Sequence, residues 1–202
     1  MRKKEEQSKA KEKLLEAAQD LMLTKGYVAT TVDDICKAAK LTKGSFFHYF
    51  KSKDDLAKAV LKRFCCSSQE GIKDHCQCGQ NEHDPRKRVM AHINHVVELS
   101  KDSKANKGCL IGKFAQELSE THPEIRVLCE EGFDQWSKMF KKDLSEAKAK
   151  YAPKAQFDVG SLADHFIAIV EGAQILAKAK RDRKIVEKSM MHFKEYLEIL
   201  FK

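Results

Sequence analysis

The sequence predicts an all-α protein, on the evidence of its composition, its lack of strand-like runs and its repeated helix caps. Lys, Glu, Ala and Leu are abundant, whereas the 202 residues include only three prolines and nine glycines. These residue types favour helices, and long runs of β-branched residues are absent. We expect about nine helices, divided between a small three-helix domain at residues 1–55 and a larger helical domain at residues 56–202.

The N-terminal helices have the clearest boundaries. An apolar stripe at helical spacing predicts the first helix at residues 9–24, and the Lys25-Gly26 pair ends it. Each of the next three helices follows a hydroxyl side chain that can cap it, at Thr31, Thr42 and Ser52. An acidic residue stands three positions after the first and last of these caps, as in a capping box.

Five later helices are expected beyond a looser stretch at residues 65–85. Pro85 is a favoured first-turn residue and opens a helix that ends near Lys101. The remaining four are expected from Cys109 to Glu120, from Pro123 to about Lys150, and at residues 157–181 and 184–202.

Charge and composition exclude several classes of protein. The net charge is +8, and residues 1–63 carry 15 Lys or Arg against 9 Asp or Glu, so most of the positive excess lies near the N-terminus. No run approaches the roughly 18 apolar residues that span a membrane, and no signal peptide is recognisable, so we expect a cytoplasmic protein without membrane contact. No catalytic triad, phosphate loop or metal-hydrolase motif occurs, so we expect neither an enzyme nor a cofactor.

Residues 30–56 predict a DNA-binding motif. Two short capped helices joined by a tight turn form a helix-turn-helix, whose second helix normally enters the major groove. This second helix opens with Thr42, Lys43, Gly44 and Ser45, which are small or basic. The local positive excess suits phosphate contacts.

Residues 9–62 strongly resemble the N-terminal domain of TetR-family transcriptional repressors. The matching features are the Thr30-Thr31 helix start, the D-I-x-K-A-A core, the K-G-S-F-F-H-Y-F segment and the following S-K-D-D-L. The resemblance implies a homodimeric repressor that binds a pseudo-palindromic double-stranded operator and dimerises through its last two long helices. It also implies a ligand cavity in the larger domain, and release of the operator when a small molecule fills it.

The resemblance assigns DNA contacts residue by residue. Thr31 and Lys53 are expected at phosphates, Phe46 at a thymine methyl, and His48 and Tyr49 at sugar-phosphate. Base edges and phosphates are expected to meet the residues that open the second motif helix, Thr42, Lys43, Gly44 and Ser45. Packing in the core is an alternative for Phe47 and Phe50, and it is the expectation for Phe50.

Two positions depart from the family pattern. Phe47 stands where relatives commonly have a Tyr whose hydroxyl binds a phosphate, so that contact is lost or moved to Tyr49. Lys40 occupies the turn position that is usually glycine, and a left-handed conformation there costs a non-glycine residue about 1 kcal/mol.

Seven cysteines provide two candidate sensors, and Cys36 is expected simply to pack. Cys109, in KGCLIGKFAQELS, lies at a predicted helix start near Lys107 and Lys113, which favours the reactive thiolate. This segment resembles a branch that includes an N-ethylmaleimide-responsive repressor, and Lys178 is placed where it approaches the thiol. A packing or capping role for Cys109 stays open.

The second candidate sensor is a group of soft metal ligands, Cys65, Cys66, His75, Cys76, Cys78 and His83. Their spacing matches no standard zinc pattern. If they bind a metal, the alternative function is a metal- or small-molecule-binding protein in which the DNA module is secondary.

A ligand cavity would need apolar side chains with a few polar anchors. Candidates on the middle helices are Phe114, Phe133, Trp136, Met139 and Phe166, with His92 and Glu117 as anchors. Ordinary helix packing explains the same aromatic residues equally well.

Overall fold

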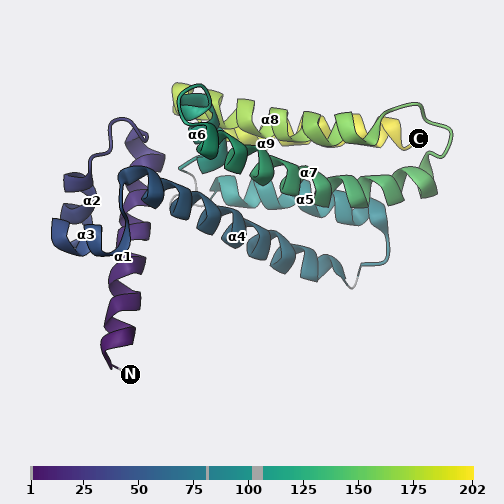
Figure 1. Cartoon of the computed structure of the whole chain (residues 1–202). Coiled ribbons are helices and arrows are strands. Elements are labelled where there is room, and N and C mark those ends of the chain that lie inside the picture. The colour runs from purple at the N-terminus through teal and green to yellow at the C-terminus, as the bar shows by residue number, and fades with distance from the viewer. Residues whose placement is uncertain (1, 81, 102–106) are drawn as a thin grey trace. The chain divides into compact units, whose positions relative to one another are not determined.

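The structure is a computed structural model that describes the backbone of residues 2–80, 82–101 and 107–202. Side chains are described for residues 9–66, 82–101 and 107–202. This part of the chain contains nine helices and no strand, which confirms the predicted fold class (Figure 1). The helices are α1 (Arg2–Lys25), α2 (Val32–Ala39), α3 (Lys43–Tyr49), α4 (Lys53–Gln80), α5 (Pro85–Lys101), α6 (Leu110–Leu118), α7 (Pro123–Tyr151), α8 (Val159–Lys180) and α9 (Lys184–Leu200).

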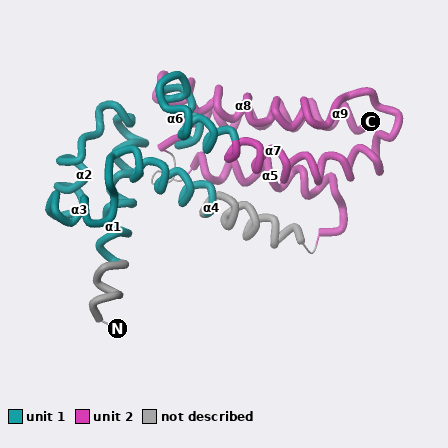
Figure 2. The backbone as a smooth tube through the Cα atoms, viewed as in Figure 1, with its two compact units in different colours: residues 1–66, 109–130 teal, residues 67–108, 131–202 magenta. Residues whose placement is uncertain are grey.

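The chain divides into two compact units, coloured separately in Figure 2. Unit 1 comprises residues 1–66 and 109–130, and unit 2 comprises residues 67–108 and 131–202. Helix α6 and the first turns of α7 therefore cluster with the N-terminal helices. The division does not coincide with the boundary expected after residue 55.

The predicted caps are confirmed in unit 1. The backbone N–H of Asp34 donates to the Thr31 hydroxyl over 3.1 Å, and the N–H of Thr31 donates to the Asp34 carboxylate over 3.0 Å, which completes the capping box. Ser45 donates its N–H to the Thr42 hydroxyl over 3.2 Å. The Ser52 hydroxyl accepts from Asp55 in the same way, over 3.1 Å.

The turn between α2 and α3 has the strain expected of its lysine. Lys40 adopts a left-handed conformation, with φ of 56° and ψ of 44°. Two reverse hydrogen bonds close the helix end, from Lys40 N–H to the Lys37 carbonyl over 3.2 Å and from Leu41 N–H to the Cys36 carbonyl over 2.9 Å. These bonds satisfy helix carbonyls that would otherwise lack partners.

Aromatic rings at the centre of unit 2 join its helices. The ring of Phe140 on α7 stacks on Phe166 of α8, with 4.3 Å between centroids, and Phe193 of α9 packs against Phe166 at 5.4 Å. Helix α8 has the length and apolar composition of a membrane span, yet Leu162 and Val170 on one of its faces are buried in this core.

One helix is longer than predicted. The sequence pattern loosens after residue 65, but α4 continues to Gln80. No proline interrupts these residues, so each of them keeps the backbone N–H that a helix needs.

Candidate nucleic-acid interface

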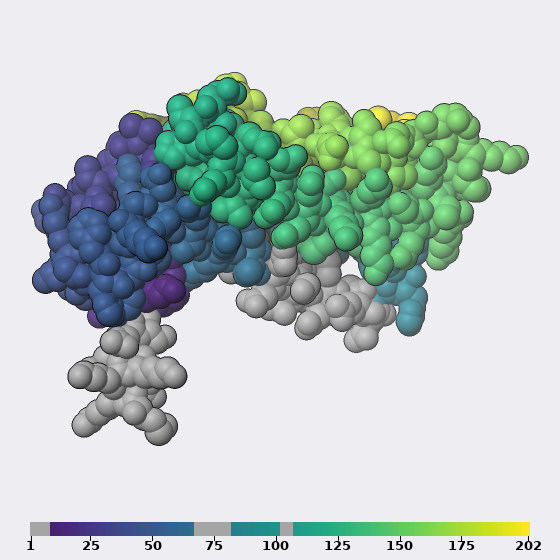
Figure 3. Space-filling view, in the orientation of Figure 1, coloured from purple at the N-terminus to yellow at the C-terminus, as the bar shows by residue number. Residues whose placement is uncertain are grey.

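Helix α3 has one buried face and one exposed face. Phe46 and Phe50 are 0% and 5% exposed, so they belong to the core of unit 1. The exposed residues of this segment are Thr42, Lys43, Gly44, Phe47 and His48. In the space-filling view, purple-blue residues in the range of α2 and α3 lie at the surface of unit 1 (Figure 3). Ser45 and Tyr49 are half-buried.

The burial of Phe46 corrects one expected DNA contact. A ring that is 0% exposed cannot reach a thymine methyl, whereas Phe47, one residue on, is 56% exposed. The two rings meet edge to face, with 5.1 Å between centroids and 80° between planes. Successive helical residues point about 100° apart, which explains why adjacent phenylalanines have opposite environments. Burial of Phe50 confirms its expected core role.

Lys43 pairs with an acidic residue of α2. Its ammonium lies 2.8 Å from the Asp33 carboxylate, and both side chains are well exposed. The hydrogen bond to Asp33 raises the pKa of Lys43, which therefore keeps its charge at neutral pH. Exposed ion pairs contribute little to stability, so a DNA phosphate can compete for this lysine.

Gly44 lies in open surroundings. A Cβ built at this position meets only the Thr42 hydroxyl oxygen, at 3.7 Å, an ordinary van der Waals distance. Nothing inside the protein therefore requires glycine here. The missing side chain suits close approach of another molecule.

Lys53 binds within the protein. Its Nζ lies 3.1 Å from both the Tyr27 and the Thr30 carbonyl oxygens, and 4.0 Å from the centre of the Tyr27 ring. These contacts hold the start of α4 against the turn after α1. The expected phosphate contact stays a prediction, as does that of Thr31, which is exposed at its cap.

Tyr27 makes several contacts within unit 1 that the sequence did not predict. The ring is buried, and its hydroxyl donates to the Asp54 carboxylate. Burial and then this hydrogen bond raise the pKa of Tyr27, so the phenol stays neutral. The signal would have been a tyrosine directly after the glycine that ends α1.

Glu117 binds the turn after α1, and its expected role as an effector anchor stays a prediction. Its carboxylate accepts hydrogen bonds from the backbone N–H groups of Tyr27, over 2.8 Å, and Val28, over 3.2 Å. Phe114 on the same helix packs against the Tyr27 ring at 6.0 Å. Both residues therefore hold α6 to the turn after α1, because a carboxylate satisfies amides that have no helical partner.

Cys109 is the N-cap of α6, as its sequence context predicts. The ammonium of Lys113, one turn later, donates to the Leu23 carbonyl at the end of α1 over 2.8 Å. Cys109 belongs to unit 1 and Lys178 to unit 2, so their approach stays a prediction.

Two other cysteines are packed in unit 1. Burial raises the pKa of both Cys36 and Cys129, and that of Cys129 reaches about 12. Their thiols are therefore poor nucleophiles at neutral pH, and the expected packing role of Cys36 is confirmed by its 6% exposure.

Several predicted effector residues come together in unit 2. Phe166 is buried beside Trp136, with 5.9 Å between centroids, and Phe140 lies between Phe166 and His92. Phe133 packs against the same core, and Met139 is half-buried. Phe166 belongs to the core, and Phe133 and Trp136 pack against it, which fits the packing alternative. The expected contacts of these residues with an effector stay a prediction.

His92 is part of a buried ionic cluster. Its Nε2 lies 2.9 Å from one oxygen of Asp143, whose other oxygen accepts from Arg88 Nε over 2.8 Å. Burial alone would raise the pKa of Asp143, but the hydrogen bonds from His92 and Arg88 outweigh it and lower that pKa. Asp143 was not predicted, because its partners lie more than 50 positions away.

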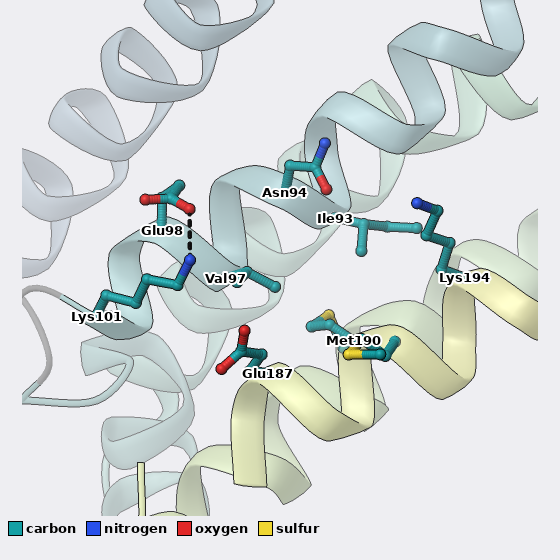
Figure 4. A pocket seen from close by; sticks show the side chains of 9 residues that line it. Ile93, Asn94, Val97, Glu98, Lys101, Glu187, Met190 and Lys194 are labelled. Atoms are coloured by element: carbon teal, nitrogen blue, oxygen red, sulfur yellow. Dashed lines mark hydrogen bonds and ion pairs between the residues drawn. The ribbon is translucent and has the colours of Figure 1, made fainter. Parts of the chain in front are cut away.

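An open pocket of about 340 Å³ lies between α5 and α9 in unit 2 (Figure 4). Ile93, Val97 and Met190 provide apolar walls, while Glu98 and Lys101 form an ion pair of 2.9 Å at its rim. None of the predicted effector residues lines this pocket.

The proposed metal cluster falls largely outside the described side chains. The side chains of His75, Cys76 and Cys78 lie outside the described residues. Of the other three, Cys65 is half-buried, and Cys66 and His83 are exposed. Among the side chains at residues 9–66, 82–101 and 107–202, no three His, Cys, Asp or Glu residues are grouped to hold a metal ion.

Comparison with known proteins matches both parts of the chain to one family. Residues 14–60 match bacterial regulatory proteins of the tetR family, and residues 85–193 match the tetracyclin repressor-like C-terminal domain. The HTH-type transcriptional repressor DhaR of Mycobacterium sp. (strain GP1) is 30% identical over 171 residues, covering 85% of this chain and 83% of DhaR. The repressor NemR of Escherichia coli (strain K12) is 23% identical over 187 residues, covering 93% of each.

Solved structures agree with this assignment. The regulatory protein TetR from Rhodobacter sphaeroides superposes with a TM-score of 0.81 at 26% identity, covering 92% of this chain and 97% of that one. In a helix-turn-helix, the second helix of the motif normally enters the major groove, and α3 is that helix here. The chain belongs to the TetR family of bacterial transcriptional regulators.

Proposed function

We propose that this regulator is a homodimeric repressor that binds a pseudo-palindromic operator through α3 and releases it when an effector binds. The observation that carries the proposal is the exposed face of α3, where Thr42, Lys43 and Gly44 stand beside Phe47 and His48. The family match supports DNA binding in preference to the metal-binding alternative.

The electrostatics of the N-terminal part suit a DNA ligand. Its 15 Lys or Arg outnumber 9 Asp or Glu within residues 1–63. Phosphate neutralisation releases counterions, so we expect affinity to fall steeply as salt rises. Such a protein acts in the cytoplasm, where the DNA is.

A second copy would cover apolar residues that α8 and α9 leave exposed. These are Ile175, Leu176, Met191, Tyr196 and Ile199. Two copies would present two α3 helices to successive major grooves, which are about 34 Å apart.

A movement of helix α6 could cause release of the operator. Glu117 binds the amides of Tyr27 and Val28, and Lys113 binds the Leu23 carbonyl, so a shift of α6 pulls on the end of α1. Cys109 caps this helix. An effector or a thiol-reactive agent that favours a shifted α6 would thus shift the population towards a state that does not fit the operator.

Footprinting and gel shift on DNA flanking the protein's own gene test the proposal. We expect one protected pseudo-palindrome, at least tenfold weaker binding by Lys43→Ala, and unchanged binding by Lys154→Ala, a control with an exposed lysine in unit 2. Absence of any protected site would refute the repressor function.

A separate experiment tests whether Cys109 senses thiol-reactive agents. N-ethylmaleimide should release the operator from the wild type and not from Cys109→Ser. Equal release from both proteins would exclude Cys109 as the sensor and leave a small-molecule effector.

A further inference from the structure

Phe47 is a large apolar side chain that the fold leaves in solvent. It is 56% exposed, whereas Phe46 and Phe50, the other two phenylalanines of this segment, are buried. Burying a phenylalanine stabilises a protein by about 1.5–3 kcal/mol, and most of that gain is forgone at this position. The ring is therefore available to a partner outside the protein.

The ring is held in place. Phe46 is anchored in the core at 0% exposure, and its ring meets that of Phe47 edge to face at 5.1 Å. Such aromatic pairs add about 0.5–1.5 kcal/mol beyond their buried area, so the contact restricts the Phe47 side chain. The outward orientation is thus built into the packing of α3.

The neighbours of Phe47 define what it faces. Lys43 lies one turn earlier on the same side of α3, and Gly44 lies three residues earlier. Both are exposed, and the space around Gly44 is open. Phe47 therefore lies on the strip of helix surface best suited to close approach by DNA.

The chemistry of the side chain limits the contact. Phenylalanine has no hydrogen-bond donor, so Phe47 cannot bind a phosphate oxygen. The apolar group that base edges present in the major groove is the C5-methyl of thymine. We propose that Phe47 reads one thymine in each half of the operator by packing against this methyl, an inference that rests on the proposed function.

The expected loss of affinity is modest for one half-site. In a symmetric complex with two half-sites, the fold-losses multiply. Removal of one buried methyl corresponds to roughly a fourfold loss of affinity. Two equivalent half-sites make the combined loss about sixteenfold, which lies well within the range of a gel shift.

Deoxyuridine scanning tests the inference, because deoxyuridine differs from thymidine only by that methyl. In the operator found by footprinting, each thymine is replaced in turn, and the affinities of wild type and Phe47→Ala are measured. We expect one thymine in each half-site at which the replacement weakens the wild type about fourfold and leaves Phe47→Ala unaffected. Phe47→Tyr should retain the sensitivity, since it retains the ring.

Two controls separate reading from folding. Lys154→Ala removes an exposed side chain of unit 2 and should keep the wild-type pattern of deoxyuridine sensitivity. Thermal unfolding of Phe47→Ala should stay close to that of the wild type, because the lost side chain is largely exposed.

The outcomes distinguish this inference from the function on which it depends. A protein that protects no DNA fails as a repressor. If the wild type binds its operator but shows no methyl sensitivity, or if Phe47→Ala keeps the sensitivity of the wild type, only the role of Phe47 is overturned.

Discussion

Gly44 occupies a helical position where nothing in the protein excludes a methyl group. Alanine favours a helix over glycine by about 1 kcal/mol, so Gly44→Ala should leave stability unchanged or raise it by up to that amount. The added methyl should nevertheless weaken operator binding at least tenfold, because it separates α3 from the groove. Circular dichroism melting and gel shift measure the two effects, and a variant with full DNA affinity would contradict the close approach.

Lys40 is strained by its left-handed backbone, with φ of 56°. Glycine adopts this region without a Cβ clash, so Lys40→Gly should stabilise the protein by about 1 kcal/mol and raise Tm by roughly 2–4 °C. Lys37→Gly is the contrasting control, because it places glycine inside α2 and should lower Tm. A Lys40→Gly variant that melts at or below the wild-type temperature would be inconsistent with strain at this turn.

Asp143 should make the stability of the folded protein depend on pH in the acidic range. Asp143→Asn leaves Arg88 and His92 without their buried carboxylate and should cost about 3 kcal/mol, or roughly 6–12 °C in Tm. The pKa of Asp143 is lowered in the folded protein, so the stabilisation is fully present above about pH 4 and disappears as the pH falls through the folded value. Melting of both proteins from pH 7 to 3 should show their difference shrinking, and a constant difference would argue against this linkage.

Residues that act on near neighbours were predictable. Thr31, Thr42 and Ser52 each bond an amide three positions away, so their roles can be read from the sequence. Phe46 and Phe47 were harder, because α3 is too short to show which of two adjacent aromatic residues is buried. The role of Glu117 was not predictable, since its partners lie about 90 positions away.

At the scale of elements, α6 is attached to the N-terminal helices by polar contacts at two points. Glu117 holds the Tyr27 and Val28 amides, and Lys113 holds the Leu23 carbonyl. Helix boundaries were predicted well where caps or prolines mark them, as at Pro85 and Pro123. The full length of α4 was not, because its last turns carry no clear apolar stripe.

Glu117→Gln tests this attachment. A glutamine can accept one of the two hydrogen bonds through its oxygen, but its NH₂ group cannot accept the other. We expect a loss of about 1.5–3 kcal/mol and faster amide hydrogen exchange at Tyr27 and Val28. Glu120→Gln, at an exposed position just beyond α6, should change neither. Unchanged exchange at both amides in Glu117→Gln would show that the carboxylate does not hold the turn.

At the scale of the whole molecule, the proposed function requires two copies of the chain to associate. Helices α8 and α9 bury one side in unit 2 and leave apolar residues exposed, with Ile199 at 66% and Ile175 at 49%. Burying these side chains against a second copy would remove apolar surface from water, which favours association. A dimer also explains why a repressor with one reading helix per copy would need a palindromic site.

The double variant Ile175→Glu/Ile199→Glu should therefore be monomeric, since burying four unpaired carboxylates in a symmetric interface opposes association. Analytical ultracentrifugation measures its mass, and circular dichroism should show intact helices because both residues are exposed in the single chain. The monomer should lose cooperative binding to the full operator while retaining weak binding to one half-site. Leu99→Glu, at an exposed apolar position on α5, should remain dimeric. A dimeric double variant would place the interface elsewhere on the molecule.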